Sequence, residues 1–558
     1  MTDASRTPTP IDEIADSWVD TAAELSPGLA TYIGRFEYND RLDDLSPEGA
    51  ERAHEATKAA LAALQAAEPV DDVDVVTKAD LANDLQLAID LHEAGAHLRD
   101  VNVIASPAQE IRNTFDLMPT DTVDDWSVVS ARLKAVPEAI RGYIETLRMG
   151  IDQGTVPARR QVTEVVGQIG RYTADNGFFA TFAGEATPSE GSLPASLARD
   201  LTDNANAARV AYDELASFLS AELAPAAAEA DAVGRELYAL HSRRFLGAVI
   251  DLDETYEWGI EELARMVAEQ EAIAREIKPG ATVEEAVAFL ESDDSRKLHG
   301  VDALQKWMQA TSDRAVEELG KTHFDIPEPI KRLECMIAPT NEGGIYYTGP
   351  TDDFSRPGRM WWSVPEGVTS FDTWRELTTV YHEGVPGHHL QIAQAVYNRA
   401  ELNSWRRLLA GSSGHAEGWA LYAERLMEQL GYLDDPADRL GMLDGQRMRA
   451  ARVVLDIGVH LKKPRLDGTG TWDADYALEF MRRNVNMSDE FIQFEVNRYL
   501  GWPGQAPAYK VGQRIWEQIR DDVADREGDS FDIKRFHMRA LRLGGVGLDT
   551  LRMALAQG

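Results

Sequence analysis

Three histidines and a glutamate within one short segment are the residues of this chain that point most directly to chemistry. The segment reads HEGVPGHH and runs from His382 to His389, with Glu383 directly after the first histidine. Neutral imidazoles are zinc ligands, and a carboxylate beside them can act as the general base that activates water. The segment therefore predicts the metal site of a zinc-dependent hydrolase.

The spacing differs from the helical His-Glu-x-x-His form, in which two ligands four residues apart share a face. Position 386, where the second ligand would stand, is proline. On a straight helix His388 would point about 120° away from His382, and His389 would lie about 10 Å along the axis. Because Pro386 and Gly387 favour a bulge or break, His388 can return to the metal. We take His388 as the second ligand and keep His389 as the alternative.

A second segment supplies carboxylates at helical spacing. It reads GSSGHAEGWALYAERL from Gly411 to Leu426, and its Glu417 and Glu424 are seven residues apart, on one face of a helix. A catalytic zinc takes three protein ligands and a water. We therefore expect Glu417 to be the third ligand and Glu424 to accept a hydrogen bond from a ligand histidine. His415 either supports the ligands or caps the helix.

Together the two motifs, HEGVPGHHLQ at 382–391 and EGWALYAE at 417–424, resemble the bacterial family catalogued as domain of unknown function 885. That family is grouped by similarity with gluzincin-type metallopeptidases, so the resemblance implies a hydrolase more firmly than a substrate. The likeness extends over most of the chain, with weaker matches at Tyr32–Arg35, Ser106–Ala108, Gly343–Tyr347, Arg498–Leu500, Pro503–Ala506 and Phe536–His537. Pro507 is a mild departure from the family pattern.

Hydrolysis of an amide also needs a donor for the developing oxyanion. Tyr509 is the first candidate, and Tyr346, Tyr347 and His537 are the others. Arg498 is a candidate for holding a substrate carboxylate with its planar guanidinium.

Composition excludes several classes of protein. The 558 residues include 94 acidic and 56 basic side chains, a net charge of −38, which disfavours nucleic acid and anionic membranes as partners. Neither a phosphate-binding glycine loop nor a Gly-x-Ser-x-Gly motif occurs. A single cysteine, Cys335, allows no internal disulfide and is expected to be buried and inert. This cysteine usage fits a reducing compartment, and we expect a cytoplasmic protein.

The elements that must position these residues are mainly α-helical. Periodic apolar residues predict a large helical fold. The metal-ligand motifs and the family that they resemble imply that this fold is zincin-like, with a deep central cleft. A soft boundary is expected near residue 240, between an N-terminal helical half (1–240) and a half carrying the metal site (241–558). The clearest predicted helices span residues 47–67, 78–100, 194–231 and 256–277. Short strands at 332–338, 344–347 and 359–364 should form a small sheet edge before the active-site helix.

The sequence thus predicts a zinc-dependent peptidase or amidohydrolase. One zinc ion per chain would be held by His382, His388 and Glu417, and Glu383 would take a proton from water and pass it to the leaving amine. Short peptides or small amides are the expected substrates. Two alternatives remain: a metal- or peptide-binding protein with a disabled site, and a metal-dependent enzyme acting on a small molecule that is not a peptide.

Overall fold

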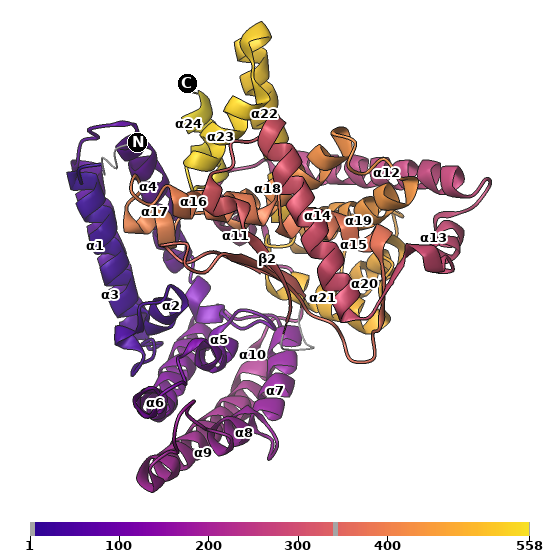
Figure 1. Ribbon diagram of the computed structural model, residues 1–558. Helices are drawn as coiled ribbons and strands as arrows, with labels where there is room; N and C mark the ends of the chain where they lie inside the picture. The colour runs from indigo at the N-terminus through magenta and orange to yellow at the C-terminus, as the bar shows by residue number, and fades with distance from the viewer. Residues whose placement is uncertain (1–5, 339–343, 557–558) are drawn as a thin grey trace.

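The chain is mainly helical, as its sequence predicts, and carries two small sheets. The computed structural model describes residues 6–338 and 344–556, so Gly343 lies outside the described residues. Within these two ranges no helix is long and apolar enough to cross a membrane. Figure 1 shows α1, α3 and α4 at one side, α5–α10 in a lower lobe, and most later helices around the central strands.

Four helices open the chain. They are α1 (Pro10–Leu25), α2 (Pro27–Tyr32), α3 (Pro47–Ala66) and α4 (Asp72–Glu93). The helix predicted at 47–67 is α3. The helix predicted at 78–100 is α4, which begins earlier because the Asp71 side chain accepts a hydrogen bond from the Asp74 N–H. It ends earlier because Gly95 takes a left-handed conformation, with φ of 68°.

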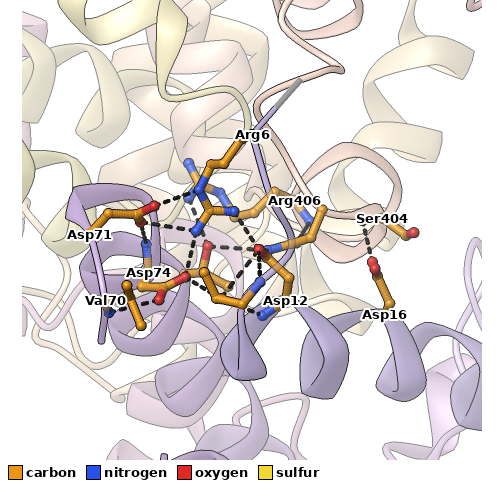
Figure 2. A network of polar contacts seen from close by, with 11 residues as sticks. Arg6, Asp12, Asp16, Val70, Asp71, Asp74, Ser404 and Arg406 are labelled. Carbon is orange, nitrogen blue, oxygen red and sulfur yellow. Dashed lines mark hydrogen bonds and ion pairs between the residues drawn. The ribbon is translucent and has the colours of Figure 1, made fainter. Parts of the chain in front are cut away.

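Polar contacts attach these first helices to the C-terminal half (Figure 2). The Arg6 guanidinium lies 2.6 Å from the Asp74 carboxylate and also contacts Asp12 on α1. The Ser404 N–H donates to Asp16 on α1 at 2.7 Å. Helix α17 (Ser404–Leu408) is therefore joined to α1, although nearly four hundred residues separate them in sequence.

The lower lobe has its own hydrophobic core, built from residues between 101 and 227. Its helices are α5 (Pro107–Asn113), α6 (Val123–Gln153), α7 (Arg159–Thr173), α8 (Phe178–Gly184), α9 (Ala195–Phe218) and α10 (Ala224–Ala226). The helix predicted at 194–231 is interrupted by a π-helical turn at Leu219–Leu223 and ends at Ala226. Pro225 has no N–H to donate to the carbonyl four residues before it, which lies within the π-helical turn.

The remaining helices share the largest core. They are α11 (Arg235–Leu246), α12 (Leu252–Ile277), α13 (Val283–Glu291), α14 (Val301–Thr322), α15 (Thr373–Glu383), α16 (His388–Tyr397), α18 (Ser413–Gln429), α19 (Pro436–His460), α20 (Ala474–Asn484), α21 (Asp489–Gly501), α22 (Ala508–Glu527), α23 (Ile533–Arg542) and α24 (Leu548–Ala556). Helix α12 is the one predicted at 256–277. Helix α19 is central, because α12, α15, α20, α21 and α22 all pack against it.

The predicted strands form a sheet just before α15. The order is β2 (Leu333–Ile337), β4 (Gly358–Trp362), β3 (Ile345–Thr348), with β2 parallel and β3 antiparallel to β4. A second sheet pairs β1 (Lys297–His299) with β5 (Ser370–Asp372). Strand β3 is an edge strand and contacts α15. Cys335 on β2 is buried, and burial raises the pKa of its thiol to about 11, in keeping with an inert side chain.

Hydrophobic packing crosses the boundary expected near residue 240. Val76 belongs to the core of the C-terminal half, whereas Trp405 packs into the cluster formed by α1, α3 and α4. The helices before residue 100 therefore pack against residues from both halves of the chain. Among the described residues, the lower lobe alone has a core made entirely from residues before 240.

Candidate metal centre

A break between two helices brings the histidines together. Helix α15 ends at Glu383 and α16 begins at His388, so the Pro-Gly segment produces a full break rather than a bulge. The Gly387 N–H donates to the Tyr381 carbonyl at 3.1 Å. A Cβ atom on Gly387 would lie only 1.9 Å from the His382 carbonyl oxygen, so this close return of the chain requires glycine.

The break places His382 and His388 against one carboxylate. Their rings meet edge to face with centroids 4.8 Å apart. The Nε2 atoms lie 3.3 Å (His382) and 3.5 Å (His388) from the same oxygen, Oε2 of Glu417. Zinc bonds of about 2.1 Å in tetrahedral geometry separate neighbouring ligand atoms by about 3.4 Å. The separation of each nitrogen from the Glu417 oxygen therefore matches that of neighbouring ligands around one small cation.

Helix α18 supplies the carboxylates from one face. Ser412 caps it by accepting a hydrogen bond from the His415 N–H, so the cap is Ser412 and not His415. Gly418 allows the helix to approach α22 closely, since a Cβ there would lie 2.4 Å from the Gly512 carbonyl carbon. Glu417 and Glu424 contact His382 on opposite edges of its ring, at Nε2 and Nδ1.

Glu424 orients the first histidine. Its Oε1 accepts a hydrogen bond from His382 Nδ1 at 2.8 Å, which turns the Nε2 edge of the ring toward Glu417. The other oxygen of Glu424 accepts from Gln446 on α19 at 3.1 Å, and Lys510 on α22 donates to Gln446 at 2.6 Å. The sequence predicted the role of Glu424 but not those of Gln446 and Lys510, which no local motif marks.

The hydrogen bonding of the cluster fits a metal ion. Oε2 of Glu417 is a buried oxygen with no hydrogen-bond partner in the described part of the chain, although two imidazole nitrogens face it. A buried carboxylate oxygen is costly without a partner, and a cation among these three atoms would supply one. Glu383 also belongs here, because one of its oxygens lies within 4.8 Å of both histidine ligand atoms.

The electrostatics of the cluster favour positive charge. Burial opposes a charge on His382, but the contacts with Glu417 and Glu424 outweigh burial and raise its pKa to about 10. Burial would likewise raise the pKa of Glu417, yet the two histidines hold it well below its usual value. Burial raises the pKa of Glu383, against the opposing charge of His388. A carboxylate with a raised pKa is suited to accepting a proton near neutral pH.

His389 lies outside this cluster. Its Nε2 donates to the Ile330 carbonyl at 2.7 Å and its Nδ1 accepts from the Tyr347 hydroxyl at 2.9 Å. Burial lowers its pKa to about 4, so the ring is neutral. With both ring nitrogens hydrogen-bonded, His389 has no lone pair for a metal, and the geometry favours His388 as the second ligand.

Tyr509 is the oxyanion candidate on which the charge of Glu417 acts most strongly. It stands at the start of α22, and the charge of Glu417, followed by burial, raises its pKa to about 12. Its hydroxyl therefore keeps its proton at neutral pH and can donate. Arg498 differs, because its guanidinium is held by the Glu495 carboxylate at 3.0 and 2.9 Å and by the Gln505 side chain at 2.5 Å.

The other catalytic candidates have other contacts. His537 is fully buried, stacks on Phe324 with centroids 4.7 Å apart and hydrogen-bonds the Tyr422 hydroxyl, and burial lowers its pKa to about 3. We therefore assign His537 to the core, not to a catalytic role. The hydroxyl of Tyr347 donates a hydrogen bond to His389, and Tyr346 is exposed on the edge strand β3.

Two large cavities lie away from the cluster. One of about 840 Å³ is lined by α14, α16 and α23, and another of about 800 Å³ is lined by α4, α11 and the end of α21. Neither is lined by the histidines or carboxylates of the cluster. The deep central cleft expected from the sequence therefore stays a prediction.

The chain belongs to a bacterial family of proteins of unknown function, DUF885, whose model matches residues 27–555. No curated protein matches it. Its fold is shared by several solved structures, among them the following two. The crystal structure of a "putative lipoprotein" from Colwellia psychrerythraea has a TM-score of 0.84 at 22% identity, covering 98% of each chain. A "putative lipoprotein of unknown function" from Shewanella oneidensis has a TM-score of 0.77 at 18% identity, covering 98% of this chain and 100% of that one.

Proposed function

We propose that this protein is a zinc-dependent hydrolase that cleaves peptide or amide bonds in short peptides. One observation carries the proposal: Nε2 of His382 and Nε2 of His388 converge on Oε2 of Glu417 at 3.3 and 3.5 Å, with Glu383 beside them. Three protein ligands and an adjacent carboxylate are the parts of a catalytic zinc site, whereas a structural site is closed by a fourth protein ligand.

Each residue of the cluster has a separate role in the proposed hydrolysis. His382, His388 and Glu417 would hold the zinc ion, which would supply a Lewis acid for the substrate carbonyl and lower the pKa of water. Glu383 takes the proton from the attacking water and passes it to the leaving amine. Tyr509, a protonated phenol beside Glu417, donates to the developing oxyanion.

Features outside the cluster are consistent with a peptide substrate. In the part of the chain that the structure describes, no strand pairs with the outer edge of β3, and β3 contacts α15, the helix that carries His382 and Glu383. An extended peptide can pair with such an edge through main-chain hydrogen bonds. The net charge of −38 argues against nucleic acid and anionic membranes as partners. A single cysteine fits the cytoplasmic location that we propose.

Elemental analysis and a cleavage screen test this function together. We expect about one zinc ion per chain, and cleavage of pooled synthetic peptides that stops after chelation and returns when zinc is restored. Bound zinc without cleavage of any peptide or small amide would favour a binding protein with a disabled site. Zinc-dependent turnover of small amides alone would favour an enzyme acting on substrates that are not peptides.

The phenol of Tyr509 gives a kinetic prediction. Because an oxyanion donor acts mainly in the transition state, Tyr509→Phe should lower kcat by on the order of ten- to a thousand-fold, with little change in KM. Steady-state kinetics on a peptide from the screen measure both constants. If Tyr346→Phe shows this loss and Tyr509→Phe does not, the donor lies on β3 instead.

A further inference from the structure

One face of helix α19 carries three polar side chains toward the metal cluster. Gln446, Arg449 and Arg452 follow one another at three-residue spacing and so lie along one side of the helix. Gln446 donates to Glu424 at 3.1 Å. Arg452 donates to the Tyr499 hydroxyl at 2.7 Å and also pairs with a carboxylate on α21 at 2.8 Å. Gln446 and Arg452, the first and third of these residues, therefore form hydrogen bonds with other side chains of the protein.

Arg449, the middle residue, has no such partner. It forms no ion pair or side-chain hydrogen bond with any residue of ranges 6–338 and 344–556, and its Nε is buried without an acceptor. Its guanidinium carbon lies 5.8 Å from the centre of the Tyr509 ring. Its charge also helps to lower the pKa of Glu424 and opposes the rise at Glu383. An unpaired, half-buried cation thus stands beside the residues proposed to act on substrate.

The helix makes room for this side chain. A Cβ atom on Gly445 would lie 2.5 Å from Nη1 of Arg449, so the guanidinium lies back across the preceding turn, over a glycine. Glycine is a poor residue for a helix interior, and no left-handed conformation requires it here. Its effect at this position is to leave space for the guanidinium of Arg449.

We propose that Arg449 binds the free carboxylate of the substrate, and that the substrates are peptides cleaved near an unblocked C-terminus. This inference rests on the proposed hydrolase function. The planar guanidinium pairs with a carboxylate through two parallel hydrogen bonds, and within ranges 6–338 and 344–556 the buried Nε of Arg449 has no acceptor. Arg498 does not suit the role, because Glu495 and Gln505 already occupy its donors. The overall charge repels anions, so recognition of a carboxylate must come from a local cation.

Matched peptide sets test the role of Arg449 in turnover. A pool of N-acetylated tetrapeptides is made twice, with free and with amidated C-termini, and kcat and KM are measured for both. Wild type should prefer free acids. Arg449→Ala should raise KM for free acids by about 10- to 100-fold and leave amides unchanged, because it removes a charged pair of hydrogen bonds. Arg449→Lys should give a KM for free acids between those of wild type and Arg449→Ala, since lysine keeps the charge but cannot form two parallel hydrogen bonds.

Two further variants separate recognition from charge and folding. Arg439 lies on the same helix as Arg449 and forms an exposed ion pair with Glu276 on α12. Arg439→Ala removes the same charge and should leave the free-acid preference intact. Gly445→Ala should displace the Arg449 side chain and reproduce part of its effect. An equal fall in kcat on acids and amides in Arg449→Ala, with KM unchanged, would mean that Arg449 acts on the transition state, and would overturn the inference.

A binding measurement distinguishes failure of this inference from failure of the hydrolase proposal. Zinc-loaded Glu383→Gln protein is titrated calorimetrically with both pools, with and without Arg449→Ala. Binding of free acids that depends on Arg449 supports the inference, even if the wild type cleaves nothing. Cleavage of acids and amides with equal efficiency, unchanged in Arg449→Ala, refutes the inference and leaves the hydrolase intact. Neither binding nor cleavage of either pool refutes both.

Discussion

Glu383→Gln should lower the rate of peptide hydrolysis by about two to four orders of magnitude while zinc stays bound. Glutamine keeps the size and polarity of the side chain but cannot take a proton from water. Glu383 is buried at the end of α15, within 4.8 Å of the two histidine ligand atoms, so an amide group can occupy the same space. Single-turnover kinetics together with elemental analysis measure the two quantities separately.

Glu376→Gln provides the matched control for this experiment. Glu376 lies on α15, two turns before Glu383, and burial raises its pKa to about 7. The same chemical change at that position should leave turnover within about twofold of wild type, because Glu376 does not belong to the cluster. Near-normal hydrolysis in Glu383→Gln would remove Glu383 from the mechanism and weaken the peptidase proposal.

Zinc affinity should fall when His388 is replaced and should stay unchanged when the adjacent His389 is replaced. His388→Ala and Glu417→Ala should each lower zinc affinity by more than about 100-fold, because a direct ligand matters more than its supporting partner, whose loss costs about 10- to 100-fold. Glu424→Gln should fall in that lower range. His389→Ala should keep about one zinc ion per chain, since both ring nitrogens of His389 bond to protein groups.

Competition with a fluorescent zinc chelator measures these affinities, and thermal unfolding reports the fold of each variant. His389→Ala should lower the melting temperature, because it leaves the Ile330 carbonyl and the Tyr347 hydroxyl without partners. The opposite pattern, zinc lost in His389→Ala and kept in His388→Ala, would shift the assignment of the second ligand by one residue.

Local sequence patterns determined most of the helices and strands and indicated the candidate ligands. Helical periodicity placed α3 and α12 to within four residues at each end, whereas α4 starts six residues and ends seven residues earlier than predicted, and short apolar runs placed the three strands of the sheet before α15. Pro386 and Gly387 marked the end of a helix, because a missing N–H and a missing Cβ are properties of the residues themselves. Two carboxylates seven residues apart on α18 had to share a face, and both contact His382.

Tertiary structure decided which of these side chains meet. Spacing could not distinguish His388 from His389, because the backbone path through the break sets the direction of each ring. Packing against Phe324 and Tyr422 placed His537 in the core, and a salt bridge along α21 engaged Arg498. That Nε of Arg449 has no acceptor among the described residues became visible only once its neighbours were known. Local sequence fixes dihedral preferences and periodicity, whereas burial and pairing depend on segments hundreds of residues away.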